Sequence, residues 1–130
     1  MLLVCRFAVA ESDTETFTAR VRTALELLTA QPGCRGGRLA RSTDLDGRWV
    51  LVVEFDSVVA YRRSLSPFPV REHVIPLLSE ALPDEPAAYE LALSAADGHA
   101  EQHVSLLASD AGTVRLGEAA GPATPRGGLG

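Results

Sequence analysis

The segment RWVLVVEF, residues 48–55, places apolar side chains on both faces of one extended strand. Side chains alternate between the two faces of a β-strand. One face therefore carries the odd-numbered residues from Trp49 to Phe55, which are all apolar, and the other carries two valines and Glu54. A layer of helices covers only one of these faces, so the other needs a second sheet. A second copy of the chain is the simplest source of one.

The elements around this strand are predicted in the order strand, helix, strand, strand, helix, strand. Ser12 with Glu15 predicts a capping box, and Ser57 predicts the start of a short helix. Asp46-Gly47 predicts a hairpin, and Pro76 a kink in the last helix. The predicted ranges are strands over 2–9, 34–42, 48–55 and 87–93, a first helix that ends at Pro32-Gly33, and helices over 57–65 and 69–82. The two longer helices carry the apolar stripes Phe17, Val21, Ala24, Leu25, Leu28 and Val70, Val74, Leu77, Leu78, Ala81.

This order predicts an α+β fold over residues 1–95, a ferredoxin-like four-stranded antiparallel sheet with helices on one face. From residue 96 the composition changes to Gly, Ala, Ser and Pro and ends in GPATPRGGLG. We therefore expect residues 96–130 to form a mostly flexible tail, with a weak hairpin where VSLLA and TVRLG flank SDAG as an alternative within it.

Charge and composition limit the partners. The net charge of −5 argues against nucleic acid and against anionic membranes. The apolar start MLLVCRFAVA has Arg6 in its middle and no basic beginning, so it predicts a first strand rather than a secretory leader. No other stretch is long enough to span a bilayer, and we expect a cytoplasmic protein. Cys5 and Cys34 are then expected to be free thiols, on strands too far apart for a disulfide.

Three charged residues, Arg6, Glu54 and Glu90, fall on the predicted face of the sheet that carries no helices. The topology makes their strands neighbours, with Arg6 in the middle. A buried charge is costly unless it is paired, so we interpret the three as an ion network in a homodimer interface rather than as a catalytic set.

Three stretches resemble the antibiotic biosynthesis monooxygenase family, namely CRFAV, QPGCRGGRLAR, and WVLVVEFDSVVAYRRSL followed by SPF. The resemblance extends over residues 1 to about 95. It implies a dimeric α+β barrel with a pocket between the sheet and the helices of each subunit.

The family members that oxidise quinols or anthrones use no metal, flavin or haem. The resemblance therefore implies a cofactor-independent monooxygenase that acts with O2 on a phenolic, quinol or anthrone polyketide-like substrate. Tyr61, in AYRRSL, matches a tyrosine at the reacting centre of the quinone-forming members. Those members carry a tryptophan and an asparagine on the third strand, where this chain has Phe55 and Leu51.

The expected pocket is apolar and suits a small aromatic substrate. Its expected catalytic residues are Tyr61 and His73. Its expected substrate-binding residues are Leu3, Cys5, Phe7, Trp49, Leu51, Phe55 and Phe68. Tyr61 also fits a packing role, and His73, three residues after Val70 and four before Leu77, also fits a buried neutral histidine.

Other functions are weighed against the oxygenase. The same barrel also suits a polyketide cyclase or a non-catalytic dimer that binds a small molecule. Haem degradation is less expected, because Cys5 and Ser64 stand where haem-degrading members have an asparagine and a tryptophan. No metal site is predicted, because His99 and His103 supply only two ligands at helical spacing.

Overall fold

The computed structural model of the chain describes residues 1–104. Residues 1–89 form one compact unit, and the described residues from Glu90 onward belong to a second. The first unit ends before the predicted domain boundary at residue 95. No helix within residues 1–104 is long and apolar enough to cross a membrane.

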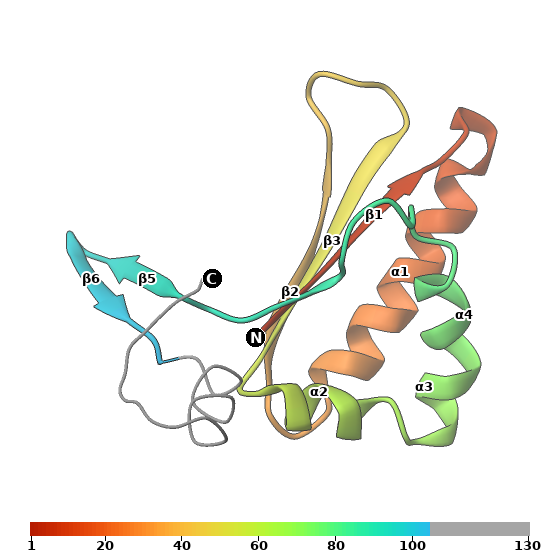
Figure 1. Ribbon diagram of the computed structural model, residues 1–130. Helices are drawn as coiled ribbons and strands as arrows, with labels where there is room; N and C mark the ends of the chain where they lie inside the picture. Colours follow the sequence, from red (N-terminus) through yellow and green to blue (C-terminus); the bar gives the residue numbers. More distant parts are fainter. Residues whose placement is uncertain (105–130) are drawn as a thin grey trace. The chain divides into compact units, whose positions relative to one another are not determined.

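The first unit is built on a four-stranded antiparallel sheet with the strand order β2-β3-β1-β4. The strands are β1 Leu2–Ala8, β2 Cys34–Arg41, β3 Arg48–Phe55 and β4 Ala88–Tyr89. Helices lie on one side of this sheet (Figure 1), so the ferredoxin-like α+β prediction is confirmed. Gly47 has a φ of +73°, the left-handed conformation that a tight hairpin turn needs, and this confirms the turn predicted between β2 and β3.

The helical elements are the 3-10 turn η1 Glu11–Asp13 and the helices α1 Thr14–Thr29, α2 Val58–Ser64, α3 Phe68–His73 and α4 Ile75–Leu78. The predicted capping box is wrong, because Ser12 lies inside η1 and Asp13 occupies the N-cap of α1 without a side-chain hydrogen bond. The predicted cap of α2 is confirmed. The Ser57 hydroxyl accepts a hydrogen bond from the backbone N–H of Ala60 at 3.0 Å.

The predicted helix over 69–82 is divided into α3 and α4 at Val74. Pro76 has no N–H to donate to the carbonyl of Glu72, as a continuous helix would require. In the first turn of α4 that missing N–H is tolerated, because no intrahelical acceptor is available there. The predicted kink at Pro76 is confirmed as a break between two short helices.

The core lies between the helices and one face of the sheet. The buried apolar residues are Met1, Leu3, Cys5, Phe7, Phe17, Val21, Ala24, Leu28, Leu51, Val53, Phe55, Val70, Val74 and Leu77. Leu25, Leu78 and Ala81 pack at its edge. Both predicted helical stripes are therefore confirmed, and the odd-numbered face of β3 is the covered one.

The last strand of the sheet is shorter than the predicted range of 87–93. Only Ala88–Tyr89 pairs regularly, and it pairs with β1. Tyr89 stands opposite Leu2, the first residue of β1, so the ladder ends where β1 begins. Leu93 begins a different strand, in the second unit.

The described part of the second unit is a hairpin of β5 Leu93–Ala96 and β6 His99–Gln102, closed by Asp97-Gly98 with both residues at positive φ. His99 lies in a strand, so it does not share a helical face with His103. The Nε2 atom of His103 instead lies 2.8 Å from Oγ of Ser94. Within residues 1–104 no three His, Cys, Asp or Glu residues come together as a metal site would require. The hairpin predicted from VSLLA to TVRLG lies almost wholly outside the described residues.

Within the single chain Arg6 and Glu54 do not pair with each other, and the interface network of Arg6, Glu54 and Glu90 stays a prediction. Leu2 stands opposite Glu54 in the β1–β3 register, so Arg6 is displaced from Glu54 by four residues along the strand. Arg6 pairs with Asp84 at 2.9 Å, from the segment that follows α4, and Glu54 pairs with Arg35 of β2 at 3.6 Å. The face of the sheet and the neighbouring strands were predicted correctly for Arg6 and Glu54. The position of each residue along its strand decides which charged side chains lie close enough to pair.

Candidate functional site

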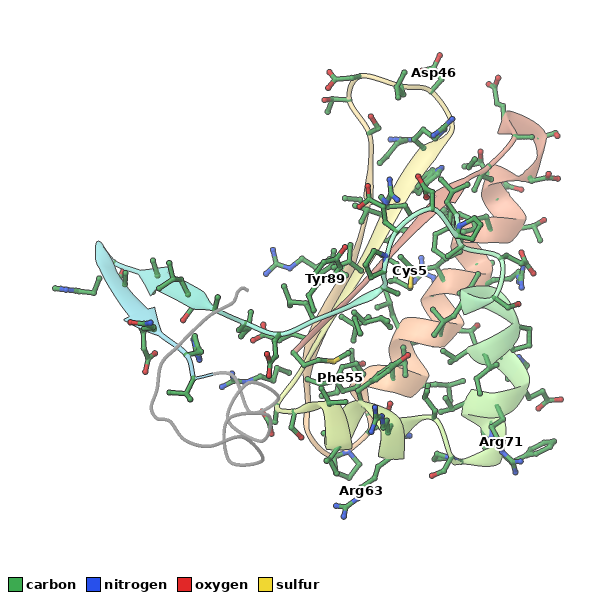
Figure 2. The ribbon with its side chains drawn as sticks, in the orientation of Figure 1. Cys5, Asp46, Phe55, Arg63, Arg71 and Tyr89 are labelled. Carbon is green, nitrogen blue, oxygen red and sulfur yellow. The ribbon has the colours of Figure 1, made fainter. Side chains whose placement is uncertain are left out.

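Tyr61 projects from α2, the helix that begins directly after β3. The Ser57 cap fixes the start of this helix, so Tyr61 stands one turn in, on the side that also carries the partly buried Val58 and Leu65. The Tyr61 ring packs against the buried Phe55, which is labelled in Figure 2, with ring centroids 5.3 Å apart and planes inclined at 60°. The Tyr61 side chain therefore leans back over the end of β3.

The Tyr61 phenol has the properties of a hydrogen-bond donor. Burial raises its pKa above the ordinary value, and the neighbouring Cys5 raises the pKa further. Within residues 1–104 the Tyr61 hydroxyl has no hydrogen-bond partner. The phenol is therefore protonated at neutral pH, and its O–H is available to donate a hydrogen bond. Tyr61 fits the role of a donor and not that of a base.

The two cysteines are free thiols, as predicted. Burial raises the pKa of the Cys5 thiol, and burial is also the main cause of the raised pKa of Cys34 at the start of β2. A thiol with a raised pKa stays protonated at neutral pH and is a poor nucleophile. Cys5 therefore contributes an apolar surface beside Tyr61 rather than reactivity.

Five of the expected pocket residues lie together on the inward face of β1 and β3. They are Leu3, Cys5, Phe7, Leu51 and Phe55. Each is at most 4% exposed, so in the single chain they are packed core rather than the wall of an open cavity. They provide a dry, apolar floor that ends beneath the Tyr61 ring.

Trp49 lies at the end of β3 away from Phe55, and it stands opposite Phe7 in the β1–β3 register. It is six residues before Phe55, which is about 20 Å at the rise of a strand. Its ring packs against Phe17 with centroids 5.7 Å apart, and the Arg41 guanidinium lies 5.3 Å from the ring centroid. These contacts border a cavity of about 400 Å³ lined by Val9, Glu11, Thr14, Arg41, Asp46, Gly47 and Trp49. Arg41 stands opposite Trp49 in the β2–β3 register. The predicted hairpin joins these two strands, so this cross-strand contact follows from the hairpin.

Phe68 and His73 are exposed, contrary to expectation. Phe68 is 64% exposed, and the Arg71 guanidinium lies 6.0 Å from the centroid of its ring. The His73 side chain is 51% exposed, with Nε2 3.5 Å from the Glu72 carboxylate. In a helix His73 stands about 60° around the axis from Val70, at the edge of the buried stripe. The interpretation of His73 as a buried histidine is therefore wrong.

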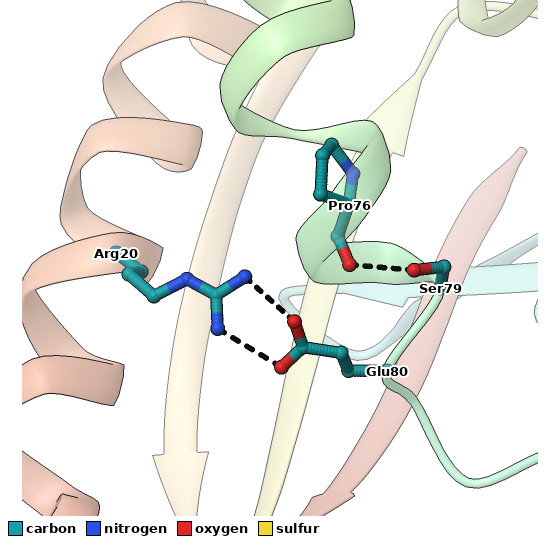
Figure 3. A network of polar contacts seen from close by, with 4 residues as sticks. All are labelled: Arg20, Pro76, Ser79 and Glu80. Atoms are coloured by element: carbon teal, nitrogen blue, oxygen red, sulfur yellow. Dashed lines mark hydrogen bonds and ion pairs between the residues drawn. The ribbon is translucent and has the colours of Figure 1, made fainter.

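His73 borders a polar groove of about 660 Å³ between α1 and the α3–α4 segment. Its lining residues are Glu15, Thr16, Ala19, Arg20, Thr23, Glu72, His73 and Pro76. Beside this groove Arg20 donates two hydrogen bonds of 2.9 Å to Glu80 (Figure 3), which join α1 to the end of α4. This pairing lowers the pKa of Glu80 and raises that of Arg20. Tyr61 is not part of this groove, so the two expected catalytic residues do not meet there.

The family model described as antibiotic biosynthesis monooxygenase matches residues 1–67, just over half of the chain. The chain belongs to the antibiotic biosynthesis monooxygenase family. The matched range contains β1 to β3, α1, and the helix α2 that carries Tyr61. The family resemblance inferred from the sequence is therefore confirmed.

Solved structures share the fold. An asparagine-to-alanine variant of SnoaB, a cofactor-independent oxygenase from Streptomyces nogalater, is 25% identical over 62% of this chain and 82% of that chain, with a TM-score of 0.54. Rv0793 from Mycobacterium tuberculosis is 22% identical over 67% and 86%, with a TM-score of 0.53. A conserved protein from Methanosarcina mazei Go1 is 18% identical over 65% and 82%, with a TM-score of 0.55. The sequence has no significant match among curated proteins.

Proposed function

We propose that this family member is a cofactor-independent monooxygenase that oxidises a phenolic, quinol or anthrone polyketide-like substrate with O2. The observation that carries the proposal is Tyr61, a half-buried, protonated phenol whose hydroxyl has no partner within residues 1–104. It stands beside an apolar floor that ends at Phe55. Family membership and the likeness to SnoaB, a cofactor-independent oxygenase, support the proposal.

In the proposed reaction the Tyr61 O–H donates to the phenolic oxygen of the substrate and stabilises the anion that forms when this oxygen loses its proton to water. The anion gives one electron to O2, and the resulting superoxide and substrate radical combine to form a C–O bond. The peroxide then loses water, and a C=O bond remains at that carbon. One oxygen atom of O2 enters the product, the other leaves as water, and the substrate supplies all the electrons.

The apolar floor would contribute through the dielectric constant and not through a reacting group. Leu51 and Phe55 are fully buried, so no water reaches them in the single chain. A hydrogen bond from Tyr61 to a developing anion is stronger where water is excluded. A planar aromatic substrate stacked beside the Tyr61 ring would meet both the donor and this dry surface.

The proposal includes a homodimer through the other face of the sheet, the face that bears Arg6 and Glu54, with Glu90 expected near it. Its central residues are Leu2, Val4, Val50 and Val52, which are partly exposed in the single chain. A monomer would leave this apolar patch in water, and a second copy would cover it. The proposed partners are thus a second copy and a small aromatic substrate, without nucleic acid or membrane, in the cytoplasm.

One observation favours a second candidate, a dimer that binds a small molecule without turnover. The floor residues are packed as tightly as an ordinary core, with Leu51 at 0% and Phe55 at 1% exposure. A filled core needs no substrate to explain its apolar residues.

Oxygen uptake distinguishes the two candidates. The full chain would be incubated with an anthrone, a naphthohydroquinone or haem in an oxygen electrode, and uncatalysed oxidation would be subtracted. The oxygenase consumes one O2 per quinone formed, and 18O2 places one labelled atom in the product. Calorimetric binding without oxygen uptake would establish the non-catalytic dimer, and haem consumption would replace the proposed substrate class.

A further inference from the structure

The outer side of α2 carries a surface that the proposed reaction does not use. One side of this helix buries Ser64 and partly buries Tyr61. The other side exposes Val59, Arg62 and Arg63, whose spacing of three and four residues places them on one helical face.

The exposed side of α3 continues this composition. Phe68, at its first position, is 64% exposed, and Val59 of α2 is 54% exposed. The Arg71 guanidinium stacks on the Phe68 ring at 6.0 Å from its centroid. Figure 2 shows Arg63 and Arg71 projecting at the same end of the first unit, the end away from the β2–β3 hairpin. We call Val59, Arg62, Arg63, Phe68 and Arg71 the arginine surface.

The charge of this surface differs from that of the chain. Residues 57–71 contain three arginines and no acidic residue, in a chain of net charge −5. Within residues 1–104, Arg62, Arg63 and Arg71 make no ion pair and have no acidic residue between them in the sequence, whereas Arg6, Arg20 and Arg35 pair with acids at 2.9 to 3.6 Å. Three unpaired guanidinium groups on α2 and α3, one of them against an exposed aromatic ring, are complementary to a segment that carries carboxylates and an apolar side chain.

We propose that the arginine surface docks an acidic segment of another protein, which places its carboxylates on the three arginines and an apolar side chain against Phe68 and Val59. An anionic membrane fits less well. Helices α2 and α3 have seven and six residues, too few for an amphipathic helix lying in a bilayer, and the chain as a whole is acidic. The proposal does not depend on the oxygenase reaction, because Tyr61 lies on the opposite side of α2.

The test uses the full chain and a synthetic 14-residue probe peptide of alternating Glu pairs and Leu or Phe. A second peptide has Gln in place of every Glu, and vesicles with about a third phosphatidylglycerol test the membrane. Binding is measured by fluorescence anisotropy of labelled peptides and by vesicle co-sedimentation. The variants are R62Q/R63Q/R71Q and F68S, and R22Q, which changes an exposed arginine on α1, is the matched control. Circular dichroism verifies that each variant is folded.

The proposal expects the acidic peptide to bind and the Gln peptide to bind at least tenfold more weakly. The triple-arginine and F68S variants should lose tenfold or more in affinity for the acidic peptide, and R22Q should bind it like the parent. Higher salt should weaken binding, because the contacts are exposed ion pairs. The proposal is overturned if no acidic peptide binds, if binding survives in both surface variants, or if vesicles bind and the peptide does not. A triple variant that changes from dimer to monomer would also overturn it, because the surface would then be covered by a second copy.

Discussion

Replacing Tyr61 by Phe separates packing from chemistry at this site. The substitution keeps the ring, and with it the 5.3 Å contact to Phe55. Within residues 1–104 the hydroxyl makes no hydrogen bond, so none is lost with it. A protein hydrogen bond contributes about 1 kcal/mol to stability. Because Tyr61→Phe loses none, its effect on stability should be smaller than that. The free energy of unfolding of Tyr61→Phe should therefore lie within about 0.5 kcal/mol of the parent in urea titrations.

The rate should respond far more than the stability. If the hydroxyl donates to a developing anion, its loss should lower kcat at least tenfold, or about 1.4 kcal/mol of transition-state stabilisation, with a smaller change in KM. Burial raises the Tyr61 pKa above its ordinary value of about 10, so the O–H is present throughout about pH 6 to 9. The ratio of parent to variant rates should therefore stay constant over that range. Tyr89→Phe, at the exposed second tyrosine on β4, is the matched control.

The assay follows O2 consumption and quinone absorbance on a substrate that the screen identifies, with binding measured by calorimetry. A variant that folds, binds and turns over like the parent would show that Tyr61 is a packing residue. A variant that loses more than about 2 kcal/mol of stability would show that the hydroxyl has a structural partner, and the donor argument would fail for that reason instead.

Four further predictions test other parts of the structure. Gly33→Ala should lower the free energy of unfolding by more than about 1 kcal/mol, because φ is +84° and the new Cβ would lie 2.6 Å from Cβ of Ala60; adding Ala60→Gly should restore part of the loss in thermal unfolding. Ser57→Ala should cost about 1 kcal/mol through the lost cap of α2, with Ser12→Ala, at an exposed serine away from α2, as control. Glu80→Gln should cost less than about 1 kcal/mol at pH 7, because the Arg20–Glu80 pair is exposed. The pKa of Glu80 is lowered in the folded protein, so the stabilisation by this pair should be complete above about pH 4.3 and should vanish as the pH falls through the folded pKa. Urea titrations at several pH values would measure this dependence. Val52→Glu should convert a dimer at micromolar concentration into a monomer in light scattering, and a parent that is already monomeric would refute the sheet-to-sheet interface.

Elements whose signals are local were predictable from the sequence. The Asp46-Gly47 turn and the Ser57 cap each depend on contacts within four residues, and both are present in the structure. Ser12 also carries a local signal, but η1 precedes α1 and moves the start of the helix past it. The last strand is shorter than predicted for a different reason: its ladder ends where β1 begins, and that limit depends on the register with β1 rather than on local residues.

Only the part of the candidate site that lies on one short chain segment, from the end of β3 to the first turn of α2, was predictable from the sequence. Tyr61 reaches Phe55 because β3 ends, Ser57 caps the next helix, and one helical turn returns the side chain to the end of the strand. The wider pocket was predicted from faces alone. A face fixes the direction of a side chain but not its position along the strand, so Trp49 and Phe55 share a face and still lie about 20 Å apart. The prediction that His73 is buried failed because His73 stands about 60° around the helix axis from Val70, which places its side chain in water rather than in the core. A set of residues on one face therefore defines one site only when their positions along each element also agree, and here that condition favours the Phe55 end of β3.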